Sequence, residues 1–104
     1  MEGKSKPVPL SKEKAINFCR KCLNEGRITW HGHIKERMNE RDISIQDVIN
    51  IIDYGEIKGE PKYSEKYQNY RYTITGHDID GRRRTLIISI EEDDEMLELI
   101  TVYR

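Results

Sequence analysis

The spacing of apolar residues changes at Gly55, and this change most constrains the fold. Before Gly55, apolar side chains recur every three or four residues, as they do on one face of a helix. After it they alternate with polar side chains, as in a strand buried on one side. A chain of 104 residues has room for one modest core. The sequence therefore predicts one α+β domain, with the helices first and an antiparallel sheet after them.

The first helix is predicted from Ser11, a good N-cap residue, to about Asn24. Gly26 follows where a helix commonly ends in a left-handed residue. Residues 27–30 predict a short extended link or edge strand. It carries the only tryptophan, Trp30, which we interpret as a core or rim anchor, with a base-stacking role as the alternative.

Two further helices are predicted before Gly55. One covers residues 31–42 and turns a tight corner into the next. The other begins at Ser44, and Asp47 stands three residues later, where it can complete a capping box. Gly55 occupies the position at which this last helix should stop.

Three to four strands are predicted in the second half. Residues 56–69 suggest a short strand followed by a polar loop, and residues 70–75 alternate cleanly. Residues 85–90 are the most apolar and predict the central strand, and residues 96–103 predict the last one. The expected fold is thus two to three N-terminal helices packed on a twisted antiparallel sheet.

The N-terminus is expected to stand apart from this domain. Residues 1–10 predict a flexible lead-in because Pro7 and Pro9 block regular structure, which leaves residues 11–104 as the domain. No secretory signal and no apolar run of about 20 residues is visible, so a cytoplasmic protein without a membrane span is expected.

Charge is divided unevenly along the chain. The net charge is −1, but residues 1–41 carry ten Lys and Arg against five Asp and Glu, whereas residues 42–104 carry eight against fourteen. This balance argues against a protein that coats nucleic acid by charge alone. A local basic surface built from the first half remains compatible with it.

A basic ridge is predicted on the second helix. His33, Arg37 and Arg41 are spaced four residues apart, so successive members lie about 40° from one another around the axis. Ile34 and Met38 form a parallel apolar stripe that can dock onto a core. A titratable imidazole beside two guanidinium groups suits a ligand that carries phosphate.

The same ridge has two structural interpretations. It can be a solvated helix face whose charges pair with neighbouring glutamates. Alternatively, Arg37 and Arg41 can hold the helix corner through Asp42 or Asp47. The spacing alone does not choose between these interpretations and a ligand site.

The two cysteines form a lone Cys-x-x-Cys. With His31 and His33, Cys19 and Cys22 could form a zinc site, but the spacing is unusual for one. Both cysteines fall on the apolar face of the first predicted helix, where cysteine behaves as a small hydrophobe. We therefore predict core packing and no metal.

One run of residues resembles a known family. It reads His33-x-x-x-Arg37-Met38-x-x-Arg41-x-Ile43-Ser44-x-x-Asp47-Val48, and the chain closes with Ile100-Thr101-Val102-Tyr103. Over residues 26–104 this pattern is similar to the domain-of-unknown-function family 4258. Its members resemble bacterial toxins of the RelE, MqsR and BrnT group, which are small α+β domains, many of which cleave RNA without a metal.

The resemblance implies the toxin of a type II toxin–antitoxin pair, with RNA as substrate, an antitoxin as partner and no cofactor. Metal-free RNA cleavage needs a base for the ribose 2′-OH, a cationic clamp and a proton donor. The catalytic candidates are His33, Arg37, Arg41, Arg71 and Tyr103. The substrate-binding candidates are His31, which can also act as the base or acid, and Arg82, Arg83 and Arg84.

Several of these candidates have simpler interpretations. Tyr103 is also suited to a half-buried place in a sheet, and Arg82 to Arg84 to a solvated strand entrance. Two other functions compete with the nuclease: a non-catalytic protein- or RNA-binding domain that uses the basic ridge, and a metal-binding regulator that uses the cysteines. RNA cleavage is the leading hypothesis.

Overall fold

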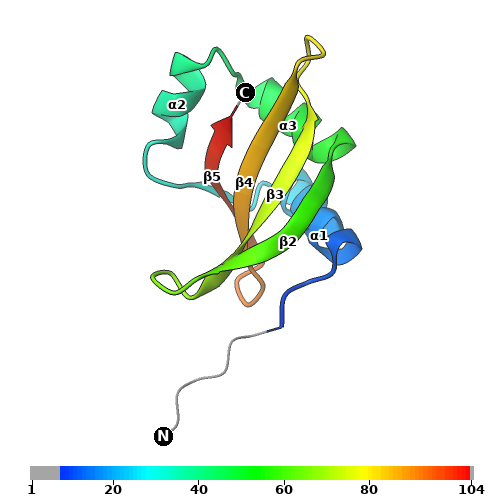
Figure 1. The fold of residues 1–104 in the computed structure, drawn as a ribbon, viewed down its shortest axis with the longest axis vertical. Helices are drawn as coiled ribbons and strands as arrows, with labels where there is room; N and C mark the ends of the chain where they lie inside the picture. Colours follow the sequence, from blue (N-terminus) through cyan, green and yellow to red (C-terminus); the bar gives the residue numbers. More distant parts are fainter. Residues whose placement is uncertain (1–7, 104) are drawn as a thin grey trace, which may run out of the picture.

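The computed structural model describes residues 8–103, so most of the predicted lead-in lies outside the described residues. The chain forms three helices and five strands (Figure 1). They are α1 (Lys12–Glu25), β1 (Ile28–Trp30), α2 (Ile34–Glu40), α3 (Ile45–Tyr54), β2 (Glu56–Ser64), β3 (Asn69–His77), β4 (Arg83–Glu91) and β5 (Met96–Tyr103). The α+β class and the order of helices before the main strands are confirmed.

The sheet has five strands in the order β1-β5-β4-β3-β2. Strands β2 to β5 form an antiparallel meander, and β4 is central as predicted. The expected sheet of three to four antiparallel strands is wrong, because β1 pairs in parallel with β5, with Ile28 opposite Leu97. A strand of three residues is too short to show a periodicity, and its partner lies at the other end of the chain.

Strand β2 is also longer than predicted. A short strand followed by a polar loop was expected over residues 56–69, but the strand extends over nine residues, Glu56–Ser64, and only residues 65–68 form the turn after it. Its register with β3 shifts between Lys58 and Lys62, around Gly59 and Pro61. This bulge explains the difference, because the two extra residues on β2 interrupt the alternation that identifies a strand.

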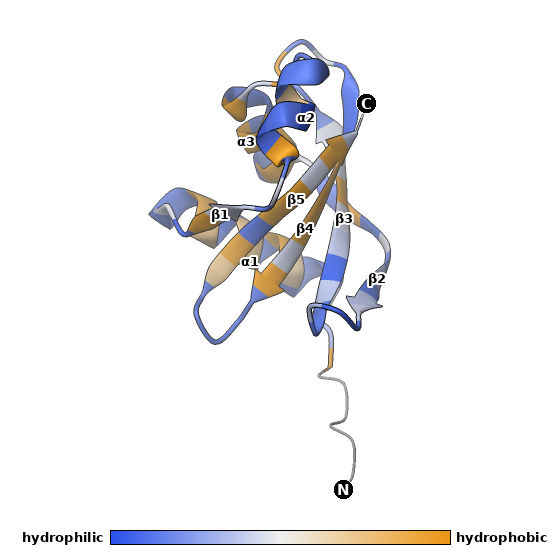
Figure 2. Cartoon of the chain, turned by 90° about the vertical axis from the view of Figure 1, so that its left-hand side faces the viewer, coloured by the Kyte–Doolittle hydropathy of each residue, from blue (hydrophilic) through white to orange (hydrophobic). Residues whose placement is uncertain are grey.

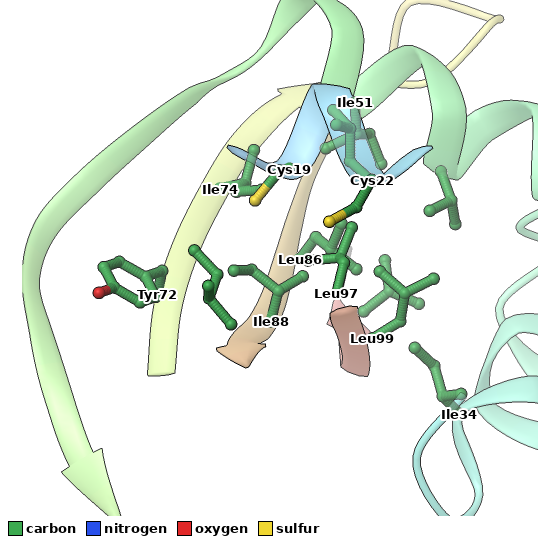
Figure 3. Close-up of a cluster of buried hydrophobic side chains, with 14 of the residues drawn as sticks. Cys19, Cys22, Ile34, Ile51, Tyr72, Ile74, Leu86, Ile88, Leu97 and Leu99 are labelled. Carbon is green, nitrogen blue, oxygen red and sulfur yellow. The ribbon is translucent and has the colours of Figure 1, made fainter. Parts of the chain in front are cut away.

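Helices α1 and α3 cover one face of the sheet. In Figure 1 the strands cross in front of them, and Figure 2 shows the two helices on one side of the strands. Alternate strand residues point toward these helices and form the core with the two cysteines (Figure 3). The fully buried members include Cys19, Ile51, Ile74, Leu86, Ile88, Leu97 and Leu99. Because these side chains leave water together, their burial is the main favourable contribution to folding.

The predicted helix ends are largely confirmed. Ser11 accepts a hydrogen bond from the Lys14 N–H at the start of α1, and Gly26 ends it with a φ of 74°. Ser44 and Asp47 form the expected capping box of α3. Gly55 ends α3 where a Cβ atom would collide with the carbonyl oxygens of Ile51 and Thr75, so glycine lets α3 pack closely against β3.

Helix α2 is shorter than the predicted 31–42 segment. It begins at Ile34, because the His31 N–H donates to the Leu99 carbonyl at 2.9 Å and continues the β1–β5 pairing. Gly32, with a φ of 46°, then turns the chain into the helix. The predicted apolar stripe is confirmed, since Ile34 and Met38 are both buried. Trp30, at the end of β1, is half-buried against the core.

The opposite face of the sheet, which we call the open face, carries mostly polar side chains. They alternate with the core residues and, apart from buried Ser89 and exposed Tyr103, are half-buried. They are Arg71, Thr73 and Thr75 of β3, Thr85, Ile87 and Ser89 of β4, and Glu98, Thr101 and Tyr103 of β5. Among the described residues, no helix is both long enough and apolar enough to cross a membrane.

Candidate active site

The three residues of the predicted basic ridge do not share one environment in the structure. His33 precedes α2, has a side chain that is 79% exposed, and places its Nδ1 3.0 Å from Glu36 Oε2. Arg37 is exposed, one turn further along α2. Arg41 instead turns toward the end of β5, where its Nη1 donates to the Val102 carbonyl at 2.6 Å. The members of the ridge thus have separate surroundings.

Arg41 also lies over the ring of Tyr103. Its guanidinium carbon is 5.4 Å from the ring centroid, a distance typical of a cation–π contact. One structural interpretation had Arg41 hold the helix corner through Asp42 or Asp47. Arg41 does tie the end of α2 to its surroundings, but through Val102 and Tyr103 of β5. Tyr103 lies on the open face, directly opposite Thr85.

The three consecutive arginines also divide. Arg82 and Arg83 are exposed, as expected for a solvated strand entrance. Arg84 is only 4% exposed, and its Nε donates to Asp78 Oδ2 at 2.9 Å. Burial acts to raise the pKa of Asp78, but hydrogen bonds from Arg82, Arg84 and Asp80 outweigh it and lower that pKa below its usual value. Arg84 therefore closes the turn between β3 and β4 and is not presented on the surface.

A histidine–carboxylate pair lies at the other end of the open face. His31 follows β1 directly, and its Nδ1 lies 2.9 Å from Oε2 of Glu98 in β5. The parallel pairing of β1 with β5 brings these side chains together, since it places Thr29 opposite Glu98. Both side chains remain accessible, with exposed fractions of 32% and 27%.

Ser89 fixes the position of the Glu98 carboxylate. This serine lies opposite Glu98 in the pairing of β4 with β5, is fully buried, and donates its Oγ hydrogen to Glu98 Oε1 at 3.0 Å. Each carboxylate oxygen consequently has its own partner. A carboxylate held against Nδ1 favours the tautomer that carries its proton there, which leaves Nε2 of His31 with a free lone pair.

A cation lies beside this pair. Arg71 is opposite Ser89 in the pairing of β3 with β4, and its guanidinium carbon is 5.0 Å from the ring centroid of Tyr67. The Tyr67 ring in turn meets the His31 ring edge-on, with centroids 5.5 Å apart. Tyr67 belongs to the turn between β2 and β3, so three separate segments meet here.

Arg71 has unused hydrogen-bonding capacity. Its Nε is buried and has no hydrogen-bond partner within residues 8–103. Buried donors are normally satisfied, and an unsatisfied one in a native structure calls for an explanation, such as a bound water or ion or a functional role. A guanidinium group with free N–H donors next to a histidine is a suitable binding site for a phosphate group. We call the set His31, Glu98, Ser89, Arg71 and Tyr67 the His31 site.

The sequence indicated only part of this site. Both His31 and Arg71 were predicted for the same RNA-cleaving site, His31 as a substrate-binding residue that could also be the base or acid, and Arg71 as a catalytic clamp. Glu98, Ser89 and Tyr67 were missed, although two of them left a signal in the sequence. Glu98 and Ser89 are isolated polar residues within apolar strands, and alternation places each on the face opposite the core.

The cysteines have no part in the site. Burial, followed by the nearby Cys22, raises the pKa of the Cys19 thiol to about 12. Burial also raises the pKa of Cys22, whose thiol donates to the Glu95 carbonyl at 3.4 Å. Within residues 8–103, no three His, Cys, Asp or Glu side chains gather in a way that could hold a metal ion. The two thiols act as core side chains.

Comparison with known proteins identifies a family. Residues 30–104 match the family model described as Domain of unknown function (DUF4258). The matched segment contains every residue of the His31 site and excludes α1. No curated protein and no solved structure matches the chain. Since the family model covers well over half of its residues, the protein belongs to the DUF4258 family.

Proposed function

We propose that this protein is a metal-independent endoribonuclease whose active site is the His31 site. The main support is the 2.9 Å contact between His31 Nδ1 and Glu98 Oε2 on an accessible sheet face, next to Arg71. A histidine oriented by a carboxylate is a general base, and a neighbouring guanidinium can stabilise charge on phosphate. These two groups are the base and the cationic clamp that metal-free RNA cleavage needs, and water can be the proton donor.

The reaction follows from this placement. Nε2 of His31 removes the proton of a ribose 2′-OH, and Glu98 stabilises the imidazolium that forms. The 2′ oxygen attacks the adjacent phosphorus as the bond to the 5′ oxygen breaks. The leaving 5′ oxygen takes a proton from water at the open face, and the imidazolium gives its proton to the hydroxide that remains, which regenerates the base. The products are a 2′,3′-cyclic phosphate and a 5′-hydroxyl, with no net change in oxidation state.

Arg71 supplies the positive charge in this scheme. No hydrogen bond or ion pair within residues 8–103 uses its terminal Nη groups, so these can bind a nonbridging phosphate oxygen, where charge increases in the transition state. Tyr67 packs against both Arg71 and His31, so it holds the cation and the base at a fixed separation. An exposed aromatic ring at this position can also contact a base of the substrate.

We further propose that the protein is the toxin of a type II toxin–antitoxin pair with a RelE-like architecture. The chain belongs to the DUF4258 family, for which the residue pattern led us to expect a resemblance to RelE, MqsR and BrnT toxins, and helices packed on one face of a small sheet favour the same architecture. The cognate antitoxin would then block the open face, and the cytoplasm would supply the RNA substrate.

Product analysis tests the chemistry. Purified protein is incubated with single-stranded RNA in excess EDTA, alongside RNA of the same sequence that carries 2′-O-methyl groups throughout. The proposal predicts cleavage of the unmodified RNA to fragments with cyclic phosphate and 5′-hydroxyl ends, and no cleavage of the methylated RNA. Cleavage that EDTA abolishes, or fragments with 5′-phosphate ends, would exclude the proposed mechanism.

A further inference from the structure

Two arginine–tyrosine pairs lie at opposite ends of the open face. One is Arg71 with Tyr67, at the His31 site. The other is Arg41 with Tyr103, in which the guanidinium carbon is 5.4 Å from the ring centroid. Tyr67 and Tyr103 are 44% and 47% exposed, which is high for a large aromatic side chain. Each ring is therefore backed by a cation and accessible to a ligand.

The register of the sheet gives the spacing of the two pairs. Arg71 lies opposite Ser89, whereas Tyr103 lies opposite Thr85, four residues earlier on the same strand. Four residues of a strand span about 13 Å. At a rise of about 3.4 Å for each stacked nucleotide, about four nucleotides would cover this distance, and fewer if the strand were extended. The two pairs would thus contact different nucleotides of one strand.

The surface between the pairs suits such a strand. It carries the hydroxyl groups of Thr73, Thr75, Thr85 and Thr101 around Ile87. None of these side chains is acidic, so nothing in this row repels a phosphate backbone. Each threonine hydroxyl can both donate and accept a hydrogen bond, which allows contact with phosphates and with ribose hydroxyls.

The surroundings of Arg41 indicate what the second pair binds. Its Nη1 is committed to the Val102 carbonyl. It also borders a hollow of about 340 Å³ that carboxylates of Glu40 and Asp42 line together with Arg82 and Arg84. The local charge is therefore close to balanced. This favours stacking of an uncharged base on Tyr103 over binding of a phosphate.

We propose that Tyr103, supported by Arg41, is a base-stacking subsite for single-stranded RNA that crosses the open face from the His31 site. This inference rests on the proposed function and deepens it by specifying a single-stranded substrate and its path. Unpaired bases are free to stack on exposed aromatic rings, whereas bases inside a duplex are not. Tyr103 touches no reacting atom in this scheme and acts only in binding.

Binding of uncleavable oligonucleotides tests the subsite without depending on catalysis. Fluorescently labelled 2′-O-methyl RNAs of two and six nucleotides are titrated with wild type, Tyr103→Leu and Tyr103→Phe. Leucine retains an apolar side chain at the end of β5 but removes the ring, whereas phenylalanine keeps the ring. Tyr54→Leu is the matched control, because Tyr54 is 81% exposed at the end of α3, away from the open face.

Tyr103→Leu should weaken binding of the six-nucleotide RNA about tenfold. Its affinity for the two-nucleotide RNA should stay at the wild-type value, because that ligand reaches only the His31 site. Tyr103→Phe and Tyr54→Leu should bind both RNAs like the wild type. Wild-type melting behaviour of Tyr103→Leu, followed by circular dichroism, shows that the variant is folded.

Three results would contradict the proposed subsite. Tyr103→Leu could bind the longer RNA as tightly as the wild type, or lose the same affinity for both lengths of RNA. The wild type could also fail to bind the longer RNA. Unchanged binding with intact RNA cleavage would remove the subsite and leave the nuclease. Ring-dependent binding by a protein that cleaves no RNA would retain the subsite and reject the nuclease.

Discussion

Nδ1 of His31 lies 2.9 Å from Oε2 of Glu98, although 67 positions separate the two residues in the chain. The contact exists because β1 adds to the edge of the sheet in parallel with β5. The His31 N–H continues this pairing by donating to the Leu99 carbonyl. The backbone that completes the sheet therefore also positions the histidine.

The carboxylate of Glu98 should matter for turnover more than for binding. Glu98→Gln keeps the size of the side chain but removes the charge that orients His31 and stabilises its protonated form. We expect kcat to fall by about 100-fold, the lower part of the range for general-base catalysis, with a small change in KM. Steady-state cleavage assays measure both. An unchanged kcat would show that the pair is only structural.

Ser89 should act as a positioning residue. Ser89→Ala removes the donor to Glu98 Oε1, so we expect a decrease in kcat that is smaller than that of Glu98→Gln. The free energy of unfolding should fall by about 1 kcal/mol, as expected for one lost hydrogen bond. Urea unfolding and cleavage kinetics provide the two readouts.

Asn50→Ala is the matched control for this serine. It also removes a side chain that donates a tertiary hydrogen bond, from Asn50 Nδ2 to the His77 carbonyl at 2.8 Å, but Asn50 lies on α3, away from the open face. Its kcat should equal that of the wild type. If Ser89→Ala lowers the stability but leaves kcat and its pH profile unchanged, the serine serves only the fold.

The fold should lose stability in acid through two aspartates. Burial alone would raise the pKa of Asp47 and of Asp78, but hydrogen bonds lower both values below normal. The donors are Ser44 and Ile79 for Asp47, and Arg82, Arg84 and Asp80 for Asp78. Groups with depressed folded-state pKa values stabilise the fold above their unfolded pKa of about 4, and this contribution disappears as the pH falls through the folded values.

Urea unfolding between pH 7 and pH 2.5 measures this effect. The wild type should lose stability steadily below about pH 4. Asp78→Asn should be less stable at pH 7 and should show a flatter decline in acid, because it has no carboxylate to protonate at that position. An equal decline in both proteins would assign the acid sensitivity to other groups.

Cys19 should resist alkylation in the folded protein. With a thiol pKa of about 12, roughly one molecule in ten thousand carries the thiolate at pH 8. We expect negligible modification by iodoacetamide under native conditions and complete modification in guanidinium chloride. Peptide mass spectrometry distinguishes Cys19 from Cys22. Rapid native labelling of Cys19 would contradict its placement in the core.

Local signals in the sequence were sufficient to predict where most of the helices begin and end. Ser11, Gly26 and the Ser44–Asp47 pair act on backbone groups within one turn, so their effects can be predicted without knowledge of the fold. The apolar segment of residues 85–90 likewise identified the central strand, because a strand covered by neighbours on both edges tolerates few polar residues. Strand β1 was expected as a short link or edge strand, but nothing in its sequence indicated the distant strand with which it pairs.

The site was harder to predict for the same reason. Spacing along a helix pointed to His33, but His33 lies in the turn that leads from the sheet into α2, and it faces solvent beside Glu36. His31 becomes a candidate base only once Glu98 is known to lie beside it. Contacts between residues far apart in the chain follow from strand pairing, which a single sequence specifies weakly.

The most direct test compares the two histidines that flank Gly32. His31→Gln and His33→Gln are made in parallel, and RNA cleavage in EDTA is measured for both and for the wild type. We expect a loss of at least about 100-fold for His31→Gln and near wild-type activity for His33→Gln. The reverse order of activities, or full activity in His31→Gln, would contradict the assignment of the active site to the open face.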